Sequence, residues 1–244
     1  MVEGLSQVHW THLRHALAFA DDVPDLFARL GSEDPAAQRE ALEAFEQRLA
    51  RGGEVYQAAA PAVPFLAQFL EKPGIDAVVR AGLLRLLAAI ATGRAPSNDD
   101  VPGEERAAWA AAARAAVRQE VPLIIRMLDS SGRDVRIAAA GLLATLDEAR
   151  GTVEPALTAR LRAEPDVVSR ANLVAALHAF LPTERLGVYD ELLAGDASML
   201  VRRQAARALV GVLGSEAPAS VEGPLLAAIS EARALQKGYG ELPW

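Results

Sequence analysis

The stretch GGEVYQAAAPAVPFLAQFL, residues 52–70, is a pair of glycines followed by an apolar segment that contains Pro61 and Pro64. Glycines commonly end one helix, and so apolar a segment predicts a second helix that is largely buried. Each proline removes a backbone N–H donor, so we expect this helix to bend where the freed carbonyls meet water. We interpret residues 52–70 as the first, outer helix of a helix pair.

The segment that follows carries a pattern that recurs along the chain. In VVRAGLLRLLAAI, residues 78–90, an arginine precedes apolar residues three, six, seven and ten positions later. Apolar residues at this spacing form one face of an amphipathic helix. The same spacing recurs in DVRIAAAGLLATL (134–146), VSRANLVAALHAF (168–180) and LVRRQAARALVGV (200–212), and less well in the helix at 36–50, where Gln38 replaces the arginine. We interpret each of these segments as the second helix of a pair.

The second helices recur at intervals typical of stacked helical repeats. Their Gln or Arg positions are 38, 80, 136, 170 and 202, which gives steps of 42, 56, 34 and 32 residues. Two-helix repeats have periods of roughly 30–47 residues. The longest step contains RAPSNDDVPG, residues 94–103, whose prolines and lack of apolar periodicity predict an exposed loop. We expect residues 1–244 to form a single domain.

Other elements are predicted from local signals alone. Residues 5–19 have the apolar spacing of an amphipathic helix, and residues 104–128 predict a long alanine-rich helix that is interrupted at Pro122. The C-terminal cap and tail, residues 221–244, are expected to cover the apolar end of the stack.

The helix pairs resemble HEAT repeats of the PBS-lyase type. The pattern D-x-x-V-R-x-x-A-x-x-A-L fits best at Val135-Arg136 and Val201-Arg202, and residues 15–30 and 52–70 resemble stretches of small actinobacterial HEAT-repeat proteins. The resemblance implies an all-α fold, a right-handed α-solenoid (an α-α superhelix) of about five or six HEAT-like helix pairs. It also implies a structural role for the arginines, in ladders of hydrogen bonds with the aspartates that precede them.

Composition and charge limit the classes of function. The chain of 244 residues is 51% hydrophobic and has no cysteine, which excludes disulfides and thiolate metal sites. No apolar run is long enough to span a bilayer, and residues 1–20 do not resemble a signal peptide, so we expect a cytoplasmic protein with no membrane association. The net charge of −7 disfavours nonspecific nucleic-acid binding. The basic residues are all arginine except Lys72 and Lys237, a bias that indicates a GC-rich genome.

The sharpest cluster of chemically active side chains is His9, His12 and His15. On a helix, residues three apart fan over one side rather than converge on one point, and zinc needs further ligands from elsewhere. We therefore expect packing or solvated histidines, with a metal site as the weaker interpretation, and no cofactor.

In HEAT-like stacks the second helices line a concave groove, so polar residues on these helices are candidate binding residues. Those not taken by the apolar positions include Glu40, Glu43, Arg85, Asn172, His178, Arg203 and Arg207. This groove would change from acidic at its N-terminal end to basic at its C-terminal end. Such a gradient suits a protein or peptide partner of opposite polarity.

No catalytic motif is present: the chain lacks GxSxG, a P-loop, HExxH, and GxGxxG after a strand. The sequence therefore favours a non-catalytic protein- or peptide-binding scaffold, with bacterial immunity, assembly and regulatory roles all open. The alternative is a HEAT-like DNA glycosylase or another nucleic-acid-acting enzyme, which needs stacking aromatics, a carboxylate and a basic groove. The tryptophans available are Trp10, Trp109 and Trp244, and none lies on a second helix.

Overall fold

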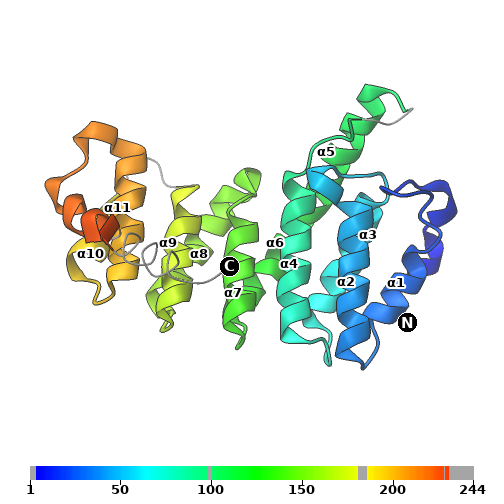
Figure 1. Ribbon diagram of the computed structural model, residues 1–244, viewed down its shortest axis with the longest axis horizontal. Helices are drawn as coiled ribbons and strands as arrows, with labels where there is room; N and C mark the ends of the chain where they lie inside the picture. The colour runs from blue at the N-terminus through cyan, green and yellow to red at the C-terminus, as the bar shows by residue number, and fades with distance from the viewer. Residues whose placement is uncertain (1–3, 98–100, 181–185, 228, 231–244) are drawn as a thin grey trace, which may run out of the picture. The chain divides into compact units, whose positions relative to one another are not determined.

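The structure is a computed structural model that describes residues 4–97, 101–180, 186–227 and 229–230 (Figure 1). These residues form an all-helical fold without strands, in which the only β-type contacts are isolated bridges from Arg14 to Phe19 and from Glu54 to Arg94. None of the described helices is both long and apolar enough to cross a membrane. The coarse expectation of an all-α fold is confirmed.

The chain divides into two compact units, Met1–Val153 and Glu154–Trp244, which we call unit 1 and unit 2. The helices of unit 1 are α1 (Val23–Leu30), α2 (Pro35–Leu49), α3 (Ala59–Glu71), α4 (Ala77–Thr92), α5 (Gly103–Gln119), α6 (Val121–Arg126) and α7 (Arg133–Leu143). Helix α8 (Arg150–Ala163) begins in unit 1 and ends in unit 2, which also contains α9 (Val167–His178), α10 (Gly187–Gly195) and α11 (Met199–Leu213).

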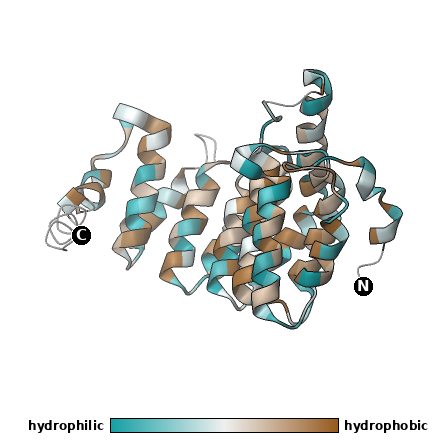
Figure 2. Ribbon diagram, turned by 45° about the vertical axis from the view of Figure 1, so that its right-hand side comes forward, coloured by the Kyte–Doolittle hydropathy of each residue, from teal (hydrophilic) through white to brown (hydrophobic). Residues whose placement is uncertain are grey.

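Unit 1 is built around α4, which packs against α2, α3, α5 and α7. The four leucines of this helix, Leu83, Leu84, Leu86 and Leu87, are at most 1% exposed, as expected for a helix that is apolar on nearly all sides. At the N-terminal end, the rings of Phe27, Phe45 and Phe69 pack together, with centroids 4.7–6.1 Å apart. Figure 2 shows that hydrophobic and hydrophilic residues alternate along the helices.

In unit 2, helices α9 and α10 pack against α11. Tyr189 of α10 is completely buried, and desolvation together with the nearby Glu154 raises the pKa of its phenol. The guanidinium of Arg170 on α9 donates to the carboxylate of Asp196, which lies directly after α10. A polar contact therefore joins the two helix pairs of this unit.

The recurrent Gln or Arg positions do have structural roles. Gln38 is fully buried, and its amide nitrogen donates to Ser32 O at 2.7 Å and to Gly74 O at 2.9 Å. Its amide oxygen accepts from the backbone N–H of Asp76 at 2.9 Å. Because Ser32 lies between α1 and α2, and Gly74 and Asp76 lie between α3 and α4, Gln38 ties two successive interhelical turns together.

The arginines act in a related way. Arg80 donates to Lys72 O at 3.1 Å and Arg136 to Ser130 O at 3.0 Å, so each holds the turn that precedes its own helix. Arg170 also donates to the carboxylate of Asp196, an aspartate that precedes α11.

The sequence prediction was wrong for residues 5–19, which do not form an amphipathic helix. Two short 3-10 turns, Leu5–Gln7 and Trp10–His12, are followed by a tight turn at residues 15–18. The turn exists because the side chain of His15 accepts hydrogen bonds from the backbone N–H groups of Leu17 and Ala18, each at 3.1 Å. A side chain that binds its own backbone in this way competes with a helix.

Other elements agree with the sequence. The four second helices beginning near 78, 134, 168 and 200 correspond to α4, α7, α9 and α11. The long segment 104–128 is interrupted as expected: α5 ends at Gln119, and α6 has Pro122 in its first turn. In the predicted loop at 94–103, residues 94–97 and 101–102 are non-helical and α5 begins at Gly103, although Pro96 is buried. Of the predicted C-terminal cap and tail at 221–244, residues 228 and 231–244 lie outside the described residues.

Candidate functional site

Helices α2, α4 and α7 lie in a row within unit 1. Helix α2 packs against α4, and α4 packs against α7, so one helix from each of three successive pairs lies beside the next. Each turns exposed positions to solvent: Glu40 and Glu43 on α2, Arg85 on α4 and Gly141 on α7. We call this surface the α2–α4–α7 face.

The acidic end of this face is electrostatically crowded. Glu40, Glu43 and Glu46 follow one another at one-turn spacing along α2, and all three are exposed. Desolvation and the negative charge of Glu43 raise the pKa of Glu46, and Arg85 on the neighbouring helix offsets this rise only in part. The structure thus brings together Glu43 and Arg85, which the sequence analysis named as candidate binding residues, and Glu46, which lies one turn after Glu43.

The remaining groove candidates belong to unit 2. Asn172 is exposed, but its amide nitrogen donates to Val168 O one turn earlier, at 2.8 Å. The ring of His178 packs against Gly211 of α11, where an added Cβ would lie 3.0 Å from two ring atoms. Arg203 is half-buried and Arg207 is exposed. Asn172 and His178 therefore make local contacts within unit 2, whereas Arg207 is exposed to solvent.

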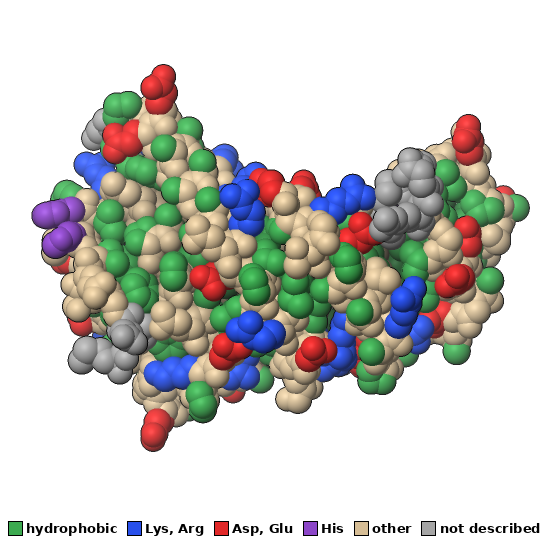
Figure 3. Space-filling view, turned by 180° about the vertical axis from the view of Figure 1, so that it is seen from behind, with side chains coloured by type: hydrophobic (Ala, Val, Ile, Leu, Met, Phe, Trp, Pro, Cys, Tyr) green, Lys and Arg blue, Asp and Glu red, His purple; other side chains and the backbone are tan. Residues whose placement is uncertain are grey.

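The three N-terminal histidines do not form a ligand set. The rings of His9 and His12 are exposed and stack with centroids 5.8 Å apart, and Figure 3 shows histidine side chains together on this surface. His15 is buried instead, with Nδ1 bound by two backbone N–H groups and Nε2 3.1 Å from Asp22 Oδ1. Within the described part of the chain, no group of three or more His, Cys, Asp or Glu residues could hold a metal ion.

Trp10 and Trp109 are part of the core. Trp10 is 4% exposed and packs against the rings of Phe27 and Phe65, and Trp109 is 7% exposed. Trp244 lies outside the described residues. A test for release of methylated purines from DNA addresses the glycosylase alternative directly.

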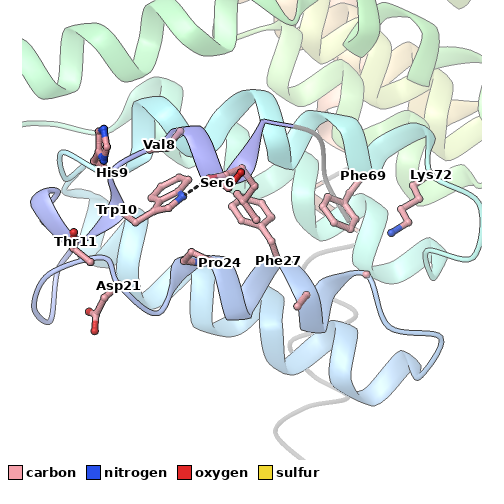
Figure 4. Close-up of a pocket in the computed structure, with 13 residues that line it drawn as sticks. Ser6, Val8, His9, Trp10, Thr11, Asp21, Pro24, Phe27, Phe69 and Lys72 are labelled. Carbon is pink, nitrogen blue, oxygen red and sulfur yellow. Dashed lines mark hydrogen bonds between the residues drawn. The ribbon is translucent and has the colours of Figure 1, made fainter.

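The structure also contains a pocket that sequence reasoning missed. It lies between the N-terminal 3-10 turns, α1 and the end of α3, and has a volume of about 740 Å³ (Figure 4). Its floor consists of Trp10, Phe27 and Phe69, and Lys72 lies at one end. Periodicity could not reveal it, because one wall is the segment at 5–11 that apolar spacing wrongly assigns to a helix. The only available signal was Lys72 itself, one of two lysines in the chain.

Comparison with known proteins supports the fold and adds no activity. No family model matches the chain, and a search of curated proteins finds no match. Among solved structures, the chain is similar to an engineered protein determined as a target of the Northeast Structural Genomics Consortium. The two share 24% sequence identity, the alignment covers 91% of each chain, and the TM-score is 0.52. At this identity the similarity concerns the fold alone.

Proposed function

We propose that this protein is a non-catalytic scaffold that binds a basic peptide segment of a partner protein on the α2–α4–α7 face. In this proposal the chain is a single domain, a right-handed α-solenoid of HEAT-like helix pairs. Its role is that of a bacterial immunity, assembly or regulatory factor in the cytoplasm. The side-by-side packing of α2, α4 and α7, one helix from each pair, supports this architecture.

One observation carries the choice of partner: the row of exposed carboxylates on α2. Glu40, Glu43 and Glu46 form no ion pair with any cation among the residues that the structure describes. The raised pKa of Glu46 indicates that like charge and desolvation outweigh the compensation from Arg85. Lysine or arginine side chains of a peptide would supply the missing positive charge, so electrostatic complementarity favours a basic partner.

The partner would lie across the helices rather than along one of them. We expect the face to continue from α2 over Arg85 to α7, where the exposed Gly141 has no side chain and a peptide backbone can approach closely. Arg85 would contact an acidic or carbonyl group of the partner. This arrangement fixes the polarity of the peptide, with its basic end over α2.

The test is a charge reversal with a matched control. A labelled peptide of alternating arginine and alanine is titrated into the full chain, and fluorescence anisotropy gives Kd. We expect the triple change Glu40→Lys, Glu43→Lys and Glu46→Lys to weaken binding by on the order of a hundredfold, because several rim charges are reversed together.

The control reverses Glu104, Glu105 and Glu148, which are also exposed in unit 1 and change the net charge by the same amount. It should weaken binding only a few-fold, through the general field of the protein. Equal losses in the two triple variants would show that the peptide responds to net charge and not to this face, and would contradict the proposal.

A further inference from the structure

We propose that the pocket between the N-terminal turns, α1 and α3 binds a small amphipathic carboxylate, with the carboxylate at Lys72 and the apolar body over the aromatic floor. This site is separate from the α2–α4–α7 face and does not depend on the function proposed for it. The volume of about 740 Å³ lies within the range of small-molecule pockets.

The floor of the pocket is rigid and apolar. Trp10, Phe27 and Phe69 are each less than a tenth exposed, so they are packed into the core and cannot move aside easily. The indole N–H of Trp10 donates to Leu5 O at 3.0 Å, which holds the 3-10 turn against the ring cluster. An apolar ligand body would therefore meet a preformed surface, which lowers the entropic cost of binding.

Lys72 supplies the positive charge at one end. Its ammonium lies 4.9 Å from the centroid of the Phe69 ring, and no carboxylate of the described residues is paired with it. A Cβ at position 31 would lie 3.0 Å from Nζ, so the absence of a side chain on Gly31 leaves room for the ammonium beside α1. This placement holds the charge at the end of the apolar floor, as Figure 4 shows.

The opposite end fixes the orientation of the ligand. His9, Thr11 and Asp21 lie there and are exposed to solvent (Figure 4). The negative charge of Asp21 repels an anionic group, so a monocarboxylate can lie only one way round. The ligand class is thus an organic acid with one carboxylate and an unbranched or flat apolar body.

The experiment compares two probes of the same length, decanoate and decanol, by isothermal titration calorimetry on the full chain. Decanoate should bind with one-to-one stoichiometry and on the order of tenfold more tightly than decanol, because it alone gains a charge-assisted contact. In Lys72→Met the preference for decanoate should disappear, while Lys72→Arg should retain it.

A second pair of variants tests the location. Ala28 is exposed and lines the pocket, so Ala28→Trp fills the cavity from its rim without disturbing the core. It should abolish binding of both probes, whereas the same change at the exposed Ala112 on α5 should leave binding intact; circular dichroism confirms that both variants fold. The proposal is overturned if Lys72→Met keeps the decanoate preference, or if Ala28→Trp binds the probes as the original chain does.

Discussion

At the level of single residues, His15 determines the path of the chain before α1. Its Nδ1 accepts from two backbone N–H groups, which requires the tautomer that donates from Nε2 to Asp22. Asp22 also accepts from Arg48 of α2 at 2.6 Å. The sequence shows a histidine at this position but not its partners, because hydrogen bonds to the backbone of a non-helical turn leave no periodic signal.

Replacing His15 with alanine should lower the free energy of unfolding by about 1–3 kcal/mol, because two backbone N–H groups lose their acceptor in a partly buried turn. Urea unfolding measures this change. His12→Ala is the control: its ring is exposed, so the change should stay within about 0.5 kcal/mol. Equal effects of the two substitutions would contradict the role given to His15.

Glu54 anchors the start of the loop between α4 and α5. Its carboxylate accepts from Ser97 Oγ at 2.7 Å, from Ser97 N at 3.1 Å and from the Tyr56 hydroxyl at 3.2 Å. Hydrogen bonding from Ser97 is the main reason that the pKa of Glu54 is lowered. The sequence predicted an exposed loop here, but could not reveal a partner that lies some forty residues earlier.

Since the carboxyl of Glu54 has a lower pKa in the folded chain, its stabilising effect is present above the ordinary carboxyl pKa. That effect is lost as the pH falls through the lower, folded value. Glu54→Gln should therefore be less stable than the original chain near neutral pH, and the difference should vanish on acidification. Urea midpoints measured across this range test the prediction, and a difference that grows toward low pH would have the wrong sign.

At the level of elements, the second helices were predictable because each buries one apolar stripe against its neighbours. Leu83, Leu87 and Ile90 of α4, and Leu142 and Leu143 of α7, are buried as their spacing requires. Residues 5–19 have similar spacing but no helix: Trp10 is buried from a non-helical path, whereas Leu17 and Phe19 are exposed. The pocket over Trp10 is a consequence of that path, and was therefore invisible to periodicity.

Helix α3 carries the two prolines of the opening stretch at different positions. Pro61 lies in its first turn, where no backbone hydrogen bond is lost, whereas Pro64 lies inside the helix and is exposed. Pro64→Ala restores a helical hydrogen bond and should raise stability by about 1 kcal/mol, less than the roughly 3 kcal/mol of a fully interior proline.

Pro61→Ala should instead leave stability unchanged or lower it slightly, through the greater freedom of the unfolded chain. Thermal unfolding of the two single variants measures the contrast. A lower melting temperature for Pro64→Ala would mean that Pro64 itself stabilises the packing of α3.

At the scale of the whole molecule, buried phenylalanine rings are concentrated in unit 1. Phe27, Phe45 and Phe69 of unit 1 are at most 1% exposed, while the most deeply buried aromatic side chain in the described part of unit 2 is Tyr189. Repeat spacing predicts equivalent helix pairs, and could not predict that aromatic packing is concentrated in the first of them. Repeat spacing likewise predicts which positions of each helix are polar, but it does not predict that Glu43, Glu46 and Arg85 lie close together.

The central claim, that the α2–α4–α7 face holds a basic peptide, is tested most directly by an amide NMR titration of the full chain with the arginine–alanine peptide. We predict that the shifted resonances belong to exposed residues of α2, α4 and α7, with Glu43, Glu46 and Arg85 among the largest changes. Shifts confined to other helices, or spread evenly over all acidic residues, would contradict the claim.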